Sequence, residues 1–227
     1  MMKSKNSYNS KQKGLLWITS GLLLIAAALF LITYNLYDGL RAEQSARQIL
    51  DRMEEYLPSE ALSESTKELI GEQDLFAIYE TTAIPDYVLC PDMEMPVETI
   101  DGIDYIGVLA IPALELELPI ISQWSYPNLK SAPCRYEGSA YLGNLIIAAH
   151  NYSSHFGNLK NLRISDVVTF TDMNGNVFHY EVAEIENLLP TSVKAMESGD
   201  WSLTLFTCTI GGKSRVTVRC QSIDDYS

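Results

Sequence analysis

The sequence predicts a mostly β domain, either a barrel or a sandwich, that is held at a membrane by a single N-terminal helix. Three features predict this: an uncharged apolar stretch near the N-terminus, a series of short apolar runs between turn residues, and a strictly alternating stretch near the C-terminus. The 227 residues are enough for one sizeable domain with its own core. Acidic residues outnumber basic ones 29 to 16, which argues against binding to nucleic acid.

The membrane anchor is predicted at residues 14–34, GLLWITSGLLLIAAALFLITY, which contain no charge. At about 1.5 Å per residue this stretch crosses the roughly 30 Å hydrocarbon layer. Four lysines and no acidic residue precede it, and the first charge after it is Asp38. The positive-inside rule therefore makes residues 1–13 a cytoplasmic tail and puts residues 35–227 outside the cell. A cleaved signal peptide is the alternative, but the run is long for one and no clear small-x-small site follows it.

Residues 35–102 are predicted to form a helical stalk and a connector. Apolar residues at helical spacing predict one helix over Leu36–Leu57, ended by Pro58, and a short second helix from Ser59 to Ile70. The acidic stretch that follows, to Gly102, is broken by three prolines and has no spacing that resembles an EF-hand loop. We therefore expect a solvated connector there, and no metal or cofactor anywhere in the chain.

Seven short strands are predicted within residues 103–222, and residues 223–227 remain as a C-terminal tail. The strands are rich in apolar and β-branched residues, and turn signals such as Asn174-Gly175 separate them. They cover Tyr105–Ala110, Leu114–Ile121, Asn144–His150, Val167–Thr171, Val177–Ile185, Leu203–Cys208 and Arg215–Cys220. Many short strands of this kind are typical of a barrel or a sandwich.

The last two strands are predicted to bring a cysteine and an arginine together. If Gly211-Gly212 is a two-residue hairpin loop, Cys208 lies directly opposite Arg215, with Cβ atoms about 4.5–5.5 Å apart. Alternation puts this pair on the face away from the main core and Cys220 on the core face. A guanidinium favours the thiolate that attacks a carbonyl, and it can also stabilise an oxyanion. The alternative is a surface pair without function, and a one-residue slip in register would separate the two side chains.

Cysteine catalysis also needs a proton carrier, which is usually histidine. His150 is the best candidate because a buried strand delivers it to a sheet edge, whereas His155 lies in a polar loop and His179 on a solvated strand face. Two further residues are weaker candidates: Asn151 to orient the His150 ring, and Trp201 to line a substrate groove.

The other two cysteines, Cys90 and Cys134, lie in stretches with no predicted secondary structure. A disulfide between them is compatible with an oxidising exterior, but the sequence does not establish that they are close together.

The stretch LTLFTC, followed by Arg215 on the next strand, resembles the TLxTC signature of sortases. NLIIAAHNYSSHFGNLKNLRISDVVTFTD is similar to the sortase segment that delivers the catalytic histidine, and YIGVLAIPALELELPI resembles the first barrel strands. The resemblance covers about residues 103–222 and implies a closed eight-stranded β-barrel with short helices. It implies a cysteine transpeptidase, a thiol protease in which Cys208 is the nucleophile, His150 the acid and base, and Arg215 the group that holds substrate and supports the oxyanion. Thr207 is a weaker candidate for lining the site.

The resemblance also implies the partners. Sortases attack the Thr-Gly bond of an LPxTG-like sorting signal in a surface protein and pass the acyl group to an amine of a peptidoglycan precursor or a pilin lysine. Residues 35–227 carry 12 Lys or Arg against 29 Asp or Glu, and such a field tolerates amine-bearing partners. No Asp-Pro-aromatic lid is evident, which favours cell-wall anchoring over pilus assembly. Two alternatives remain: a membrane-anchored cysteine endopeptidase that releases its product to water, and a non-catalytic surface-binding β-domain.

Overall fold

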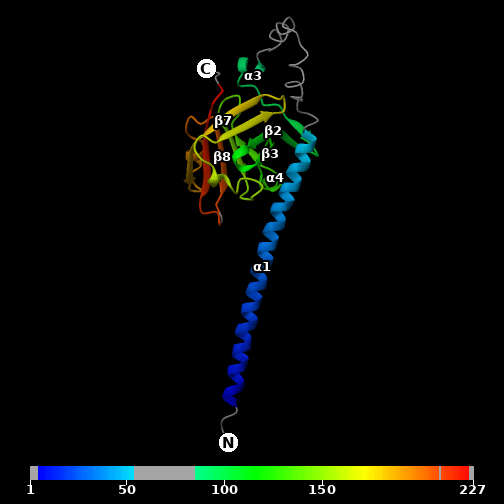
Figure 1. Cartoon of the computed structure of the whole chain (residues 1–227), viewed down its shortest axis with the longest axis vertical. Coiled ribbons are helices and arrows are strands. Elements are labelled where there is room, and N and C mark those ends of the chain that lie inside the picture. Colours follow the sequence, from blue (N-terminus) through cyan, green and yellow to red (C-terminus); the bar gives the residue numbers. More distant parts are fainter. Residues whose placement is uncertain (1–4, 54–84, 210, 225–227) are drawn as a thin grey trace. The chain divides into compact units, whose positions relative to one another are not determined.

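The computed structural model describes residues 5–53, 85–209 and 211–224, with side chains from residue 14 onward. The chain divides into two compact units, Met1–Arg41 and Ala42–Ser227. Helix α1 (Lys5–Met53) begins in the first unit and ends in the second (Figure 1). The short helix predicted from Ser59 to Ile70 lies outside the described residues.

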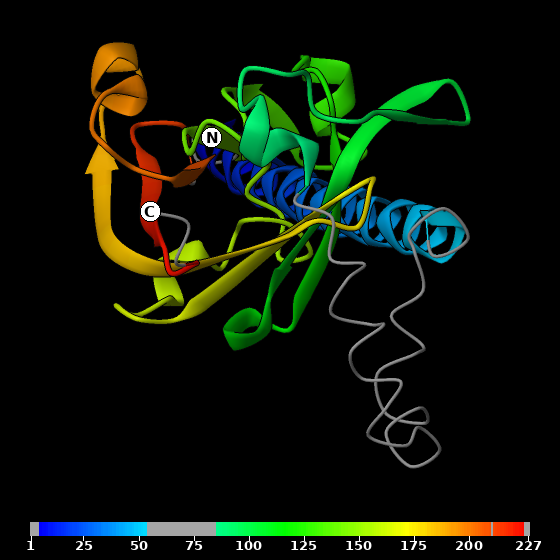
Figure 2. The same cartoon turned by 90° about the horizontal axis from the view of Figure 1, so that it is seen from above.

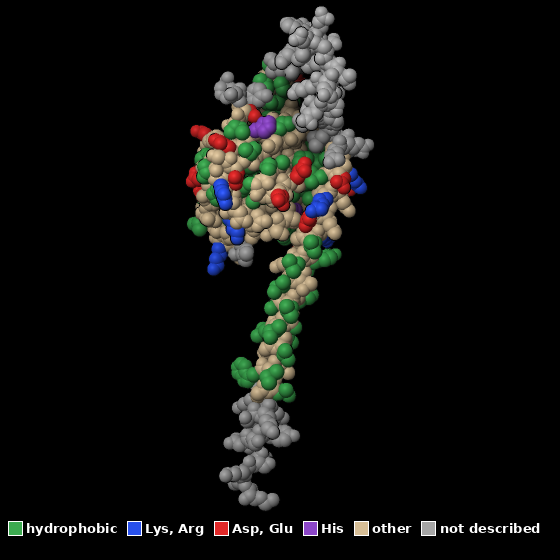
Figure 3. All heavy atoms as spheres, viewed as in Figure 1, with side chains coloured by type: hydrophobic (Ala, Val, Ile, Leu, Met, Phe, Trp, Pro, Cys, Tyr) green, Lys and Arg blue, Asp and Glu red, His purple; other side chains and the backbone are tan. Residues whose placement is uncertain are grey.

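The first unit contains the apolar part of α1. This helix is long and apolar enough to cross a membrane, and among the described residues it is the one candidate span. Its apolar side chains, such as Trp17, Leu23 and Phe30, are exposed along the helix (Figure 3). Such a continuous apolar surface is unfavourable in water, so it fits the predicted anchor. The predicted anchor and stalk helices form one continuous helix rather than two.

The second unit contains a closed barrel of eight strands, as the resemblance implied. Seven strands follow one another by hydrogen bonding from β2, and the eighth, β6, pairs back with β2 to close the barrel (Figure 2). Around the barrel the strands are β2 (Ile103–Ile111), β3 (Leu116–Ile121), β4 (Cys134–Glu137), β5 (Leu145–Ala149), β8 (Leu203–Cys208), β9 (Arg215–Ser222), β7 (Val177–Leu188) and β6 (Val167–Asp172). A further short strand, β1 (Glu98–Ile100), pairs with the start of β2.

Besides α1, the described residues contain five short helical segments, one before β1 and four between later strands. They are α3 (Asp86–Leu89), η1 (Pro112–Leu114), α4 (Tyr126–Leu129), η2 (Leu159–Asn161) and α5 (Val193–Glu197). All seven predicted strands are present; Leu203–Cys208 has the predicted bounds, and the other six have slightly shifted ends. The strand predicted from Leu114 begins two residues later, because Pro112 starts a 3₁₀ turn instead.

Two hydrophobic clusters lie on opposite faces of the barrel wall. In β5, Leu145 and Ile147 belong to the first cluster, whereas Ile146 and Ala148 belong to the second. Because successive strand residues point to opposite faces, one cluster fills the barrel interior and the other covers its outside. The end of α1 contributes Ile49 and Met53 to the second cluster, and Met53 is fully buried. The end of the predicted stalk therefore packs on the barrel.

The compact unit that holds the barrel begins at Ala42, and both the end of α1 and β1 pack within it. The domain boundary at residue 103 stays a prediction.

All four cysteines are free thiols, so the disulfide considered between Cys90 and Cys134 is not formed. Cys90 is exposed and Cys134 is buried, and this burial raises the pKa of the Cys134 thiol to about 12.

Candidate functional site

The hairpin of β8 and β9 has the register that the sequence predicted. Cys208 pairs directly with Arg215, and Leu203 pairs with Cys220 at the other end. The loop between them contains Gly211 and Gly212, both with positive φ, at 82° and 68°. Glycine adopts this backbone conformation without the penalty that other residues incur, so these two residues permit a tight turn.

The thiol of Cys208 lies beside a positive charge. Arg215 Nη1 donates a hydrogen bond to Cys208 Sγ over 3.5 Å, and the Arg215 guanidinium also lies 5.9 Å from the centre of the Phe206 ring. Cys208 is exposed, whereas Arg215 is half-buried. The sulfur is therefore open to an incoming molecule and adjacent to a group that stabilises negative charge.

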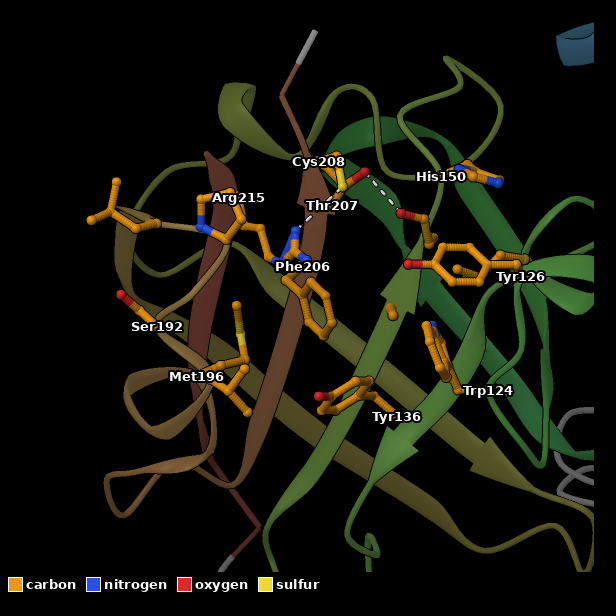
Figure 4. Close-up of a pocket in the computed structure, with 16 residues that line it drawn as sticks. Trp124, Tyr126, Tyr136, His150, Ser192, Met196, Phe206, Thr207, Cys208 and Arg215 are labelled. Atoms are coloured by element: carbon orange, nitrogen blue, oxygen red, sulfur yellow. Dashed lines mark hydrogen bonds between the residues drawn. The ribbon is translucent and has the colours of Figure 1, made fainter. Parts of the chain in front are cut away.

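His150 directly follows strand β5, which runs parallel to β8. In this pair Ala149 lies opposite Thr207, so the residues that follow them, His150 and Cys208, emerge at the same end of the barrel. Thr207 is almost fully buried, and its hydroxyl donates a 2.8 Å hydrogen bond to the Ala149 carbonyl (Figure 4). This bond ties the two strands together one residue before both candidate side chains.

The His150 ring is half-buried and lies against the ring of Tyr152, with centroids 5.1 Å apart. Figure 4 shows Cys208 between Arg215 and His150, and in this view the imidazole is directed away from the thiol.

The other two histidines lie in different surroundings. His155 lies in the loop after β5, as predicted, but its side chain is fully buried and both ring nitrogens lack a hydrogen-bond partner. Burial, and secondly the nearby His150, lower the pKa of His155 to about 4. His179 lies on the exposed outer face of β7, as predicted, and its Nδ1 is 2.9 Å from Asp224 Oδ1.

Cys208, Arg215 and His150 line one cleft, which is hereafter the cleft (Figure 4). Its floor contains Phe206, whose ring meets the Tyr136 ring edge-on with centroids 5.3 Å apart. One wall is formed by α5 and the residues before it, and the other by the connection from β3 to β5. The wall and floor residues are Trp124, Tyr126, Leu129, Tyr136, Ala148, Ala149, Leu189, Pro190, Ser192, Val193, Met196, Phe206 and Thr207.

Most of these lining residues were not predicted from the sequence, because they come from two distant connections. The partial exposure of apolar groups such as Trp124 and Val193 becomes informative only once the fold brings them to one cleft. Of the weaker candidates, Thr207 lines the cleft, whereas Trp201 and Asn151 are not among its lining residues. Trp201 instead packs closely against the backbone of Gly199.

No group of three or more His, Cys, Asp or Glu residues is arranged to hold a metal ion within residues 5–53, 85–209 and 211–224. The arrangement in the cleft suits covalent chemistry by a thiol: an exposed sulfur, an adjacent guanidinium, a nearby imidazole and largely apolar walls.

Comparisons with known proteins identify the family. A family model described as Sortase domain matches residues 109–223, just over half of the chain. Sortase A of Bacillus anthracis is 29% identical over 125 residues, which are 52% of this chain and 59% of that protein. The chain thus matches about three fifths of that relative's length. Among solved structures, sortase C1 of Streptococcus agalactiae aligns with 79% of this chain and 100% of its own, with 20% identity and a TM-score of 0.53.

Proposed function

The chain belongs to the sortase family, and we propose that it is a membrane-anchored cysteine transpeptidase. Its substrate is a surface protein with an LPxTG-like sorting signal, and its acceptor is an amine of a peptidoglycan precursor or a pilin. The observation that carries the proposal is the 3.5 Å contact between Arg215 Nη1 and Cys208 Sγ in a cleft that His150 also lines.

In the first half-reaction, the Cys208 thiolate attacks the carbonyl carbon of the scissile peptide bond. The negative charge that develops on the carbonyl oxygen is stabilised by the Arg215 guanidinium, which already lies beside the sulfur. The C–N bond then breaks, and the leaving amine takes a proton from the His150 imidazolium. A thioester on Cys208 and a free amine result.

In the second half-reaction, an acceptor amine attacks the thioester carbonyl. Neutral His150 takes the proton that the amine loses, and the Cys208 thiolate leaves. A new amide bond forms, and both side chains return to their starting charge. Water in place of the amine would give hydrolysis, so the yield of amide depends on how well the acceptor competes with water.

The walls of the cleft support recognition of a peptide with apolar side chains. Tyr136, Phe206 and Met196 present apolar surface within the same cleft as Cys208. Aromatic rings gain from covering apolar groups and add preferred edge-to-face contacts, as the Tyr136–Phe206 pair already does. We expect the residues just before the scissile bond to contact these side chains.

We propose that the apolar part of α1 anchors the enzyme in the cell membrane with its N-terminus in the cytoplasm. The four lysines at the N-terminus and the absence of acidic residues before Asp38 support this orientation. The barrel would then act outside the cell, where sorting signals and wall precursors are located. Accessibility of an engineered surface cysteine to an impermeant reagent on whole cells tests the orientation.

The activity is tested by incubating the full-length chain in detergent with a small library of LPxTG-like peptides and an amine acceptor. Mass spectrometry then identifies the products. A ligated product that is absent with Cys208→Ala supports a transpeptidase and identifies the sorting signal. Hydrolysis alone at every acceptor concentration supports an endopeptidase, and the absence of any product contradicts the proposal for these signals.

A further inference from the structure

Arg219 is a buried arginine on the same strand face as Arg215. Only 2% of its surface is exposed, and it lies four residues further along β9, about 13 Å away at the usual rise per residue. The paired residues on this face are Cys208 with Arg215, Phe206 with Thr217 and Thr204 with Arg219. The face that carries the thiol and guanidinium therefore also holds a second guanidinium, and this one lies underneath the protein surface.

Arg219 makes four polar contacts. Its Nη2 donates to the Ala195 carbonyl over 2.5 Å, and its Nη1 donates to the Met196 carbonyl over 2.7 Å. Nη1 also lies 3.1 Å from Thr204 Oγ1, and Nε lies 2.9 Å from Glu186 Oε1. A single planar guanidinium thus joins three strands and one helix, which a lysine cannot do because it lacks the rigid fork.

The two carbonyls that Arg219 binds belong to α5, which is only five residues long. A helix of this length is not stable by itself, and its last carbonyls have no partner within the helix. At the other end, Ser192 makes no side-chain capping bond. The guanidinium therefore supplies the missing donors and places a positive charge at the C-terminal end, where it is favourable.

The same turn of helix forms one wall of the cleft. Val193 and Met196 line the cleft, and Met196 is 4% exposed. Thr217, between Arg215 and Arg219 on the strand, also contacts Met196, with 3.9 Å between Oγ1 and Sδ. The strand that presents Arg215 to the thiol is thus bonded, through Arg219, to one wall of the cleft.

We propose that Arg219 is a positioning residue that holds α5 in place and thereby fixes the substrate-binding wall relative to Cys208. Arg219 does not line the cleft and takes no part in the chemical steps. The part of this inference that concerns substrate rests on the proposed function, whereas the part that concerns the position of α5 does not. If Arg219 had only a structural role, its substitution would lower the free energy of unfolding of the domain without changing substrate binding.

The test compares Arg219→Met and Arg219→Lys with Arg52→Met, which removes an exposed arginine paired with Asp101 outside the cleft. For the full-length chain in detergent, we expect KM for the best sorting-signal peptide to rise about tenfold in Arg219→Met, with kcat changed less than about threefold. The Arg219→Lys variant keeps the charge but not the fork, so KM is expected to rise as well. Arg52→Met is expected to behave as the parent.

A second measurement does not depend on activity. The Met196 amide donates to the Ser192 carbonyl over 3.0 Å, so its hydrogen exchange reports the opening of α5. We expect exchange at Met196 to be about tenfold faster or more in Arg219→Met under conditions where the barrel amides remain protected. If Arg219→Met does not fold, KM and the exchange at Met196 are measured in Arg219→Lys and Glu186→Gln instead, and these values decide whether Arg219 positions α5.

The inference is overturned if Arg219→Met has the KM of the parent and also the parental rate of hydrogen exchange at Met196. It is also overturned if kcat falls as much as kcat/KM in this variant, because KM is then unchanged. If the parent processes none of the peptides, the proposed function fails. The exchange at Met196 then still decides whether Arg219 fixes α5, and unchanged exchange would overturn that as well.

Discussion

Arg215 Nη1 lies 3.5 Å from Cys208 Sγ, and the two residues are direct partners across the β8–β9 hairpin. Their proximity is therefore set by backbone pairing and by the short loop at Gly211 and Gly212, not by a long flexible segment. The hydrogen bond from Thr207 to the Ala149 carbonyl links this hairpin to the strand that ends at His150. These local constraints give the proposed site its geometry, and each leads to a measurable expectation.

Substituting Cys208→Ala is expected to abolish cleavage and ligation because no other cysteine is among the residues that line the cleft. The fold should persist, since Cys208 is exposed at the end of its strand. Product formation by mass spectrometry and the thermal unfolding temperature provide the two readouts. The matched control is Cys90→Ala, which removes the other exposed thiol. Turnover in Cys208→Ala at more than a trace of the parental rate would remove its assignment as nucleophile.

Substituting His150→Ala is expected to lower kcat by about 10²-fold or more, the range found for loss of a general acid and base. His179→Ala is the matched control, because His179 lies on the outer face of β7 and pairs with Asp224. Steady-state kinetics of peptide ligation measure both variants. Similar losses in the two variants would leave the proton carrier unassigned and would contradict the proposed role of His150.

Substituting Arg215→Lys keeps the positive charge but removes the planar fork. Because the guanidinium contacts both the Cys208 sulfur and the Phe206 ring, we expect kcat/KM to fall at least about tenfold. A Lys variant as active as the parent would show that charge alone is sufficient. Arg215→Met has neither the charge nor a hydrogen-bond donor, so its kcat/KM gives the lowest value expected in this comparison.

Substituting Thr207→Val removes the hydroxyl that donates to the Ala149 carbonyl, at a site that is only 2% exposed. Leaving this buried carbonyl without its donor is expected to lower the free energy of unfolding by about 1–3 kcal/mol. Chemical denaturation measures this loss, and Thr169→Val on β6 provides a partly exposed control. A stability equal to that of the parent would mean that the hydroxyl bond contributes nothing to the link between β5 and β8.

His155 is expected to make the fold less stable in acid. Its folded pKa is about 4 and its ordinary value is 6.5, so between these pH values the unfolded chain binds a proton that the folded chain excludes. The free energy of unfolding therefore falls as the pH drops through this window, by about 3 kcal/mol in total at 1.36 kcal/mol per pKa unit.

This pH dependence is tested with His155→Leu, which replaces the buried ring by an apolar side chain. Denaturation at pH 7.5, about one pH unit above the His155 window, and at several values down to pH 4 gives the free energy of unfolding of each protein. The difference between the variant and the parent should grow in favour of the variant as the pH falls. A constant difference over the whole range would contradict the buried, neutral state of His155.

The hairpin, the position of His150 and most of the strands follow from local patterns in the sequence. Alternation and a Gly-Gly loop define the pairing of Cys208 with Arg215, and a continuous apolar run identifies the strand before His150. The resemblance to sortases added the closed barrel, which the pairing of β6 with β2 confirms. Local patterns suffice for these features because each depends on residues close together in the chain.

Other features depend on contacts between distant segments and were not predicted. Strand β4 has only four residues, too few for an alternating pattern to stand out in its sequence. It also pairs with β3 at a single position. His155 follows several polar residues, yet the fold buries it completely. The role of α5 as a cleft wall depends on Arg219, which lies more than twenty residues away in the sequence.

The proposed mechanism requires a thioester between Cys208 and the acyl part of the sorting signal, and the mass of the protein after reaction reveals this adduct. The full-length chain is mixed with the best peptide without acceptor amine, quenched with acid, and digested to locate the added mass. We expect an increase equal to the acyl part of the peptide, located at Cys208, absent in Cys208→Ala and lost when an amine is added before the quench. An adduct at Cys90 alone, or ligated product formed by Cys208→Ala, would contradict the role of Cys208 as the nucleophile.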